Sequence, residues 1–101
     1  MSSIRKNNQI ARSEPKSLEA ERAVLGSMLI SKEAVPRAMT FLTEDCFYET
    51  NHAIIFSNII QLFENNIAID TISLVDSLKK NKQLTKVGGA YYITGLSNEA
   101  P

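Results

Sequence analysis

The feature that most constrains this fold is an apolar stripe at helical spacing in the segment after Asn51. Residues three and four positions apart share one face of a helix. Here such positions hold Ile55, Phe56, Ile59, Ile60 and Phe63. Ile54 and Leu62 lie off this stripe, so much of the helix circumference is apolar. We therefore expect the longest helix here, capped by Thr50 or Asn51 and buried on more than one side at the centre of the core.

Shorter helical patterns precede this segment. Ser17 predicts the N-cap of a first helix over residues 18–30, since a serine oxygen can accept from the exposed N–H groups of a first turn. Gly26 inside it costs about 1 kcal/mol relative to alanine, which suggests that another helix approaches closely there. A second helix is expected over 32–42, with Pro36 in its first turn, where its missing N–H costs nothing.

A third short segment is expected to open at Thr43. Glu44 and Asp45 would occupy its first turn, where negative charge is favoured by the exposed backbone N–H groups. Phe47 and Tyr48 follow, and both are expected to point into the core.

After the central helix, asparagine and aspartate residues mark the expected beginnings and ends of helices. That helix should end at residues 65–66, because asparagine tolerates the left-handed conformation that closes helices. Asp70 or Thr71 is expected to cap a fifth helix, and Asn81 to end it. The predicted buried face of the fifth helix consists of Ile72, Val75 and Leu78.

The stretch VGGAYYITGL predicts a glycine turn at Gly88 and Gly89 and a final helix over 90–97. A phosphate-binding loop would need a Lys-Ser/Thr pair after its glycines, and none is present here. Tyr91 and Tyr92 are adjacent, so they point about 100° apart on a helix and one should reach the surface. An exposed tyrosine is a frequent interface anchor. The alternative is that both are half-buried core residues with solvated hydroxyls.

Charge and composition bound the kind of protein. The net charge is zero, but residues 1–16 carry +3 and the remainder −3. Residues 1–16 hold few apolar side chains, so we expect a flexible basic tail followed by one domain over 17–101. One cysteine, no apolar secretory signal and no apolar run of membrane-spanning length predict a cytoplasmic protein without membrane association.

The sequence contains no recognisable group of catalytic or metal-binding residues. His52 and Cys46 are the single histidine and cysteine, which is too few ligands for a metal site. We expect His52 to be a helix-surface or hydrogen-bonded residue, and we expect Glu44, Asp45 and Glu49 to serve no acid–base role. A small enzyme would require a deep polar pocket that gathers His52 with several carboxylates. We therefore predict no catalytic residue, no metal site and no bound cofactor.

These patterns predict an all-α protein, a compact orthogonal bundle of about six short helices. A helix-turn-helix that reads DNA is disfavoured, because the final helix AYYITGLS contains no Arg, Lys, Asn or Gln. A free-standing small helical DNA-binding protein that uses its basic tail remains the alternative function.

Taken in order, five segments resemble the amino-terminal domain of the DnaB-type replicative DNA helicases. They are PKSLEAERAVLGSML, TEDCFY, NHAIIFSNIIQL, AIDTISLVDSLKKNKQL and VGGAYYITGL. The resemblance extends from Pro15 to Pro101. Where the family often has glycine this chain has Asn66 and Asn81, and it lacks the proline that the family often has near Glu44.

The resemblance implies a larger parent protein, a ring-shaped hexamer that unwinds DNA at the replication fork. Its ATP and magnesium sites would lie in a RecA-like motor domain beyond Pro101, after a helical hairpin. This domain would assemble with its copies into dimers and a hexamer collar. It would dock primase through the helicase-binding region at the carboxy terminus of primase, and it could contact a helicase loader, with little or no DNA binding of its own. Tyr91 and Tyr92 are the candidate partner contacts.

Overall fold

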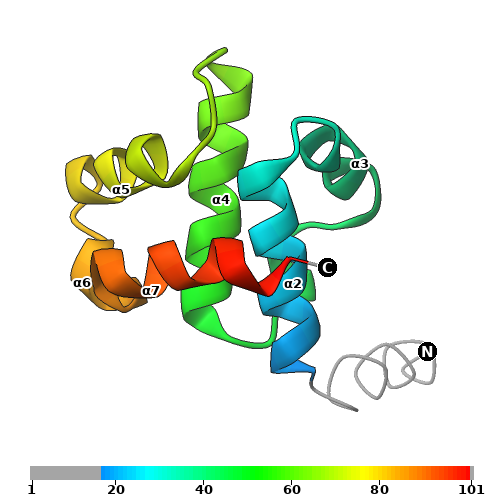
Figure 1. The fold of residues 1–101 in the computed structure, drawn as a ribbon, viewed down its shortest axis with the longest axis horizontal. Helices are drawn as coiled ribbons and strands as arrows, with labels where there is room; N and C mark the ends of the chain where they lie inside the picture. Colours follow the sequence, from blue (N-terminus) through cyan, green and yellow to red (C-terminus); the bar gives the residue numbers. More distant parts are fainter. Residues whose placement is uncertain (1–16, 101) are drawn as a thin grey trace, which may run out of the picture.

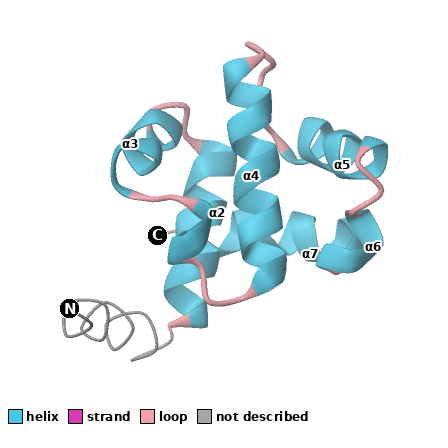
Figure 2. Ribbon diagram, turned by 180° about the vertical axis from the view of Figure 1, so that it is seen from behind, coloured by secondary structure: helices cyan, strands magenta, loops and turns pink. Residues whose placement is uncertain are grey.

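The computed structural model describes residues 17–100, which form six α-helices and two short 3₁₀ helices (Figure 1). Across this described range there is no strand (Figure 2), so the predicted all-α class is confirmed. The flexible tail predicted for residues 1–16 lies outside the described residues. The elements are α2 (Leu18–Ile30), α3 (Ala34–Phe41), η1 (Glu44–Cys46), α4 (Thr50–Glu64), α5 (Thr71–Lys80), α6 (Leu84–Val87), α7 (Gly89–Leu96) and η2 (Ser97–Glu99).

Helix α4 is the central element, as the apolar stripe predicts. In Figure 1 it stands upright between α3 on one side and α5 on the other, while α5 and α7 run across its direction. The buried hydrophobic side chains come from every α-helix: Leu25, Met28, Leu29, Val35, Phe47, Ile55, Phe56, Ile59, Leu62, Leu74, Leu78, Val87, Ile93 and Leu96. One core is therefore shared by the whole described chain.

The buried face of α4 differs from the predicted stripe. Leu62 is buried, whereas Phe63 is 38% exposed. The face is instead completed by two polar residues, His52 and Asn58, which are both buried. The predicted cap is also wrong, because Glu49 is the N-cap residue and its side chain makes no capping bond.

Helix α2 begins as predicted, with the Ser17 hydroxyl accepting from the Ala20 N–H at 3.0 Å. Gly26 lies where the end of α7 meets α2. A Cβ atom on Gly26 would lie 2.2 Å from the backbone oxygen of Leu96, so the predicted close approach is confirmed. Helix α3 is shorter than predicted and contains Pro36 in its first turn.

Phe47 and Tyr48, after η1, do not both enter the core. Phe47 is buried and its ring centroid lies 5.0 Å from that of Phe56. Tyr48 is exposed, so the prediction that it points inward is wrong. Its backbone N–H donates to the carboxylate of Glu21, which holds the chain at this point through the main chain.

The turns before and after α5 agree in part with the predicted helix ends. Asn66 has a φ of 59°, which confirms the left-handed closure of α4. Asp70 caps α5, accepting from the Ser73 N–H at 2.8 Å in a capping box. Asn81 is not left-handed, and the residue that adopts this conformation is Lys82, with a φ of 58°.

The buried face of α5 is rotated from the predicted one. Leu74 and Leu78 are fully buried and Ser77 lies beside them, while Ile72 is 79% exposed. Ser77 is inside because its hydroxyl donates to Asn58 Oδ1 at 2.7 Å. The hydrophobic pattern omits this serine and so places Ile72 on the wrong face.

Asn58 joins three segments in a buried polar junction. Its Nδ2 donates to the Ile54 carbonyl at 2.8 Å and to Gln83 Oε1 at 2.9 Å. Its Oδ1 accepts from Ser77 and also from Asn81 Nδ2 at 2.8 Å. All hydrogen-bonding positions of the amide are thus engaged, which fixes α5 and the start of α6 against α4.

The sequence patterns do not predict α6, a single turn before the glycines. Gly88 and Gly89 then have φ values of 117° and 83°, a conformation that side chains with a Cβ rarely adopt. Helix α7 starts at Gly89, one residue earlier than predicted, and is followed by η2. Among the described helices, none is long and apolar enough to span a membrane.

Candidate protein-interaction surface

Helix α7 carries both candidate tyrosines, and they point in different directions. Tyr91 is 92% exposed, while Tyr92 is partly buried against the core. The expectation that one of the two reaches the surface is confirmed, and the alternative that both are half-buried is wrong. Ile93 and Leu96 are buried on the opposite side of α7 from Tyr91, so the helix is held firmly while Tyr91 projects from it.

A shallow groove lies between α5 and α7. Its volume is about 310 Å³, and its lining includes Ile72, Val75 and Thr94. Tyr91 lies one helical turn before Thr94 and therefore on the same side of α7. We call Ile72, Val75, Tyr91 and Thr94 together the α5–α7 surface. It presents two large exposed apolar side chains, Ile72 and Tyr91, with Lys79 and Asp76 along the groove.

Tyr92 belongs to a hydrogen-bonded chain of three side chains from three helices. Its hydroxyl lies 2.5 Å from Nε2 of His52, and Nδ1 of His52 lies 2.7 Å from Oε1 of Glu21. The rings of His52 and Tyr92 are also stacked, with centroids 5.9 Å apart. We call Glu21, His52 and Tyr92 the polar bridge, because it connects α2, α4 and α7.

The partners define the proton positions in the polar bridge. A carboxylate only accepts hydrogen bonds, so Nδ1 of His52 carries the proton that faces Glu21. In the neutral ring Nε2 then accepts from the Tyr92 hydroxyl. Glu21 also accepts from the backbone N–H groups of Tyr48 at 2.5 Å and Glu49 at 3.4 Å, at the positive amino-terminal end of α4.

This arrangement supports structure rather than turnover. His52 is 1% exposed and both of its ring nitrogens have protein partners, so a reactant cannot reach them. The prediction of a hydrogen-bonded histidine is confirmed and the helix-surface alternative is wrong. Among residues 17–100, Glu21 is the one carboxylate hydrogen-bonded to His52, whereas Glu44 and Asp45 lie in η1 and have no hydrogen bond to it. Within residues 17–100 no three His, Cys, Asp or Glu side chains converge as metal ligands would.

Sequence reasoning missed the roles of Glu21 and Asn58. Glu21 lies in the first turn of α2, where a carboxylate ordinarily only complements the helix amino terminus, yet its carboxylate binds groups 27 to 31 residues further along the chain. No local pattern signals such a contact. Asn58 offered one signal, since it is a polar residue three positions after Ile55 and four before Leu62, among apolar residues of the same helix.

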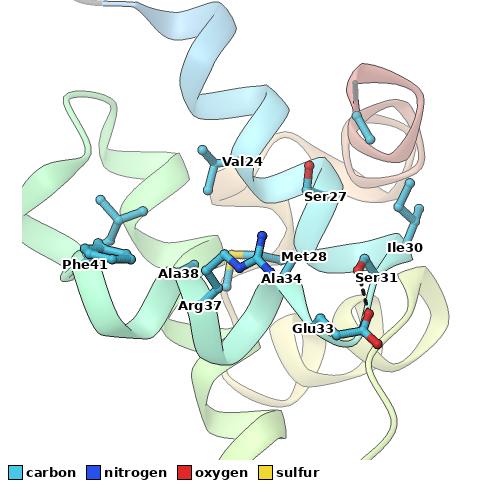
Figure 3. Close-up of a pocket in the computed structure, with 12 residues that line it drawn as sticks. Val24, Ser27, Met28, Ile30, Ser31, Glu33, Ala34, Arg37, Ala38 and Phe41 are labelled. Atoms are coloured by element: carbon cyan, nitrogen blue, oxygen red, sulfur yellow. Dashed lines mark hydrogen bonds between the residues drawn. The ribbon is translucent and has the colours of Figure 1, made fainter.

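A second and larger groove runs between α2 and α3 (Figure 3), with a volume of about 770 Å³. Met28 lies at its centre, and the small side chains of Ala34 and Ala38 border it. Phe41 lies at one end and Ile30 at the other, and both are exposed. Apolar surface is therefore found on α2–α3 as well as on α5–α7.

Comparison with solved structures shows what kind of domain this is. The chain is similar to the N-terminal domain of the DnaB helicase from Mycobacterium tuberculosis, with a TM-score of 0.82 and 30% sequence identity. The similarity covers 84% of this chain and 62% of that one. The fold is thus that of a helicase N-terminal domain.

Sequence comparisons identify the family. The family model described as DnaB-like helicase N terminal domain matches residues 13–101, and the chain belongs to this family. The replicative DNA helicase DnaB of Rhodothermus marinus is 38% identical over 91 residues, which cover 90% of this chain and 10% of the relative. The replicative DNA helicase DnaC of Bacillus subtilis is 31% identical over 87 residues, 86% of this chain and 19% of the relative. The chain spans only a small part of the length of these relatives.

Proposed function

We propose that this chain is the assembly and primase-docking head of a hexameric replicative DNA helicase. The parent protein would work in the cytoplasm and unwind DNA at the replication fork, with ATP and magnesium bound in a RecA-like motor domain. The head would contribute binding and geometry. The observation that carries the proposal is the exposed Tyr91, which lies one helical turn before Thr94 of the groove between α5 and α7, on a domain of this family.

The α5–α7 surface has the properties of a docking site. Binding costs less entropy when the anchor residue is already held in place. Tyr91 stands on a helix whose other side is fixed by buried Ile93 and Leu96 and by the polar bridge through Tyr92. A tyrosine ring adds a large apolar area together with a hydroxyl, a combination that is enriched among interface residues with high energetic weight.

Tethering explains how a head without chemistry would serve the fork. A primase held beside the unwinding ring acts at a raised local concentration, set by the length of the connection and not by a reaction in the head. Copies of the head that associate into a collar would add further docking sites. A helicase loader is a second candidate partner of the same collar.

Binding of a primase carboxy-terminal domain, measured by calorimetry, tests the proposal. Tyr91→Ala should weaken the affinity by about tenfold or more, because interface anchors commonly contribute above 1 kcal/mol. Phe41→Ala is the matched control, since it removes another largely exposed aromatic ring, which lies on α3 at the α2–α3 groove. Circular dichroism should show both variants folded. Equal affinity for the wild type and Tyr91→Ala would contradict the assignment of the surface, and no binding by any form would contradict primase docking.

A free-standing DNA-binding protein is the function to be distinguished. Residues 1–16 would then supply the affinity for phosphates, which falls steeply as salt rises. Titration of duplex DNA at physiological salt, with and without residues 1–16, separates the two functions. Tight binding that disappears with the deletion would favour DNA binding over the helicase head.

A further inference from the structure

A further groove lies between α3, η1 and α4. Its volume is about 500 Å³, and we call it the α3–α4 groove. The hydrophobic side chains that line it are Met39, Leu42, Phe56 and Ile60. Phe56 is buried, and the other three are partly buried against the core. These side chains therefore form an apolar floor.

The rim of the α3–α4 groove is acidic. Glu44 and Asp45 border it from η1, and Glu64 borders it from the end of α4. All three are exposed, and no Lys or Arg lines the groove. Within residues 17–100 none of the three carboxylates forms an ion pair. An apolar floor with an acidic rim is complementary to a segment that carries both apolar and positively charged side chains.

Residues 1–16 of this chain, the basic tail, have this chemistry. Their net charge is +3, because four basic residues stand against the single acidic residue Glu14. The basic residues are Arg5, Lys6, Arg12 and Lys16. Two large apolar side chains, Ile4 and Ile10, alternate with them along the sequence. The basic tail is thus complementary to the α3–α4 groove in both charge and hydrophobicity.

The basic tail joins the domain near η1. It leads into Ser17, which lies one helical turn, about 6 Å, before Glu21. The Glu21 carboxylate accepts from the backbone N–H of Tyr48, which follows Asp45 by only three residues. Ten residues of extended chain span about 33 Å, so the tail is long enough to pass η1 and follow α4 toward Glu64.

We propose that residues 4–12 dock in the α3–α4 groove of their own domain, with Ile4 and Ile10 on the apolar floor and the basic side chains paired with the acidic rim. A segment that is tethered beside its site is present at an effective concentration in the millimolar range, which favours it over a segment of another protein. Basic side chains that are held by this rim are withheld from the phosphates of DNA. The inference goes beyond the proposed function and requires neither primase nor a second copy.

Paramagnetic broadening in NMR spectra of the full chain tests the docking. Cys46 is the single cysteine, it is exposed and it follows Asp45, so a nitroxide on its sulfur lies beside the groove. The amide signals of residues 4–12 should then lose most of their intensity. A nitroxide on Lys79→Cys, in a Cys46→Ser background, is the control, because α5 lies across α4 from α3 (Figure 1). Equal tail intensities with the two labels would overturn the proposal.

Charge reversal in the groove tests the pairing. Glu44→Lys combined with Glu64→Lys should restore the tail signals in the chain labelled at Cys46, because like charges then face the basic tail. Glu33→Lys combined with Asp76→Lys is the matched control, since it changes the net charge equally at exposed carboxylates outside this groove. The control should leave the broadening in place. Equal release of the tail by the two double variants would overturn the groove assignment.

Charge reversal in the tail supplies the rescue. Arg5→Glu combined with Arg12→Glu should release the tail from the wild-type groove. When these changes are combined with E44K/E64K, opposite charges face each other again and the broadening should return. A combined variant whose tail stays released would overturn charge pairing. The substituted groove residues are exposed, so circular dichroism should show every variant folded.

A mixed sample identifies whose tail occupies the groove. It contains isotope-labelled chains without nitroxide and nitroxide-labelled chains without isotope. Docking within one chain predicts no broadening in this mixture, whereas broadening of the tail signals would overturn docking within the same chain. These spectra contain neither primase nor DNA. Their failure would therefore leave the proposed function standing, and a failure of primase binding would leave the docked tail.

Discussion

Replacing Gly26 with alanine should destabilise this domain, although the same change stabilises most helices. Alanine is favoured over glycine in a helix interior by about 1 kcal/mol. At Gly26 the new Cβ would lie 2.2 Å from the backbone oxygen of Leu96, and 3.2 Å from the Leu96 carbon and the Ala100 nitrogen. All three are main-chain atoms, so no side-chain rotation can relieve the contact.

The magnitude follows from the displacement that is needed. A carbon and a carbonyl oxygen are normally about 3.3–3.6 Å apart even in close contacts, so the end of α7 and η2 would have to move from α2 by about 1 Å. Forcing extra atoms into a packed site costs about 1–3 kcal/mol, and more when the backbone must move. Even after the gain in helix propensity, we expect a net loss of about 1–2 kcal/mol.

Thermal unfolding followed by circular dichroism measures this loss. Each kcal/mol lowers the Tm of a domain of this size by about 4–8 °C. Gly95→Ala is the matched control, because it lies in α7 and its Cβ would meet no atom within 4 Å. That variant should unfold at or above the wild-type temperature. A Gly26→Ala variant as stable as Gly95→Ala would refute the reasoning, since it would show that the contact with Leu96 relaxes without cost.

Two further substitutions test other parts of the fold. Tyr92→Phe removes the hydroxyl that pairs with the buried Nε2 of His52, and it should lower the free energy of unfolding by about 1–3 kcal/mol in urea titrations. The control Tyr91→Phe should change the free energy of unfolding by less than about 0.5 kcal/mol. Equal effects of the two variants would contradict a structural role for the polar bridge. Lys82→Gly should raise the free energy of unfolding by about 0.5–1 kcal/mol, because Lys82 adopts a left-handed φ of 58° that glycine adopts without steric cost. A destabilised variant would show that the contacts of the lysine side chain stabilise the fold by more than this strain costs.

The sequence predicts the parts of this fold that depend on neighbouring residues. The Ser17 and Asp70 caps and the left-handed Asn66 follow from hydrogen bonds and backbone preferences within a few positions. Gly26 is a longer-range success, because glycine in a helix has a known cost and therefore indicates a compensating contact. Lys82 is the counterexample: its conformation comes from the turn after α5 and is not signalled by its own residue type.

The faces of α4 and α5 were mispredicted for one physical reason. A hydrophobic pattern assumes that polar residues lie outside, whereas His52, Asn58 and Ser77 are buried because each has hydrogen-bond partners inside. Most of those partners lie far away along the chain, so the sequence does not reveal them. When the polar residues are left out of the pattern, the predicted faces shift toward exposed Phe63 and Ile72.

The candidate contacts show the same limit. Adjacency alone predicts that one of Tyr91 and Tyr92 is exposed, but not which one, because the choice depends on the position of His52 across the core. The primase-docking role of either tyrosine stays a prediction. The α2–α3 groove and exposed Phe41 were not anticipated, since a groove depends on how two helices pack and not on either sequence alone.

The position of Glu21 also has a consequence for the order of folding. Helix α4 lacks a side-chain cap of its own, and the N–H groups just before it are bound by a carboxylate from α2. The first turn of the longest helix should therefore fray in an isolated peptide and become ordered only when α2 docks against it. In kinetic experiments, this end of α4 should form late, together with long-range contacts, while its middle forms early.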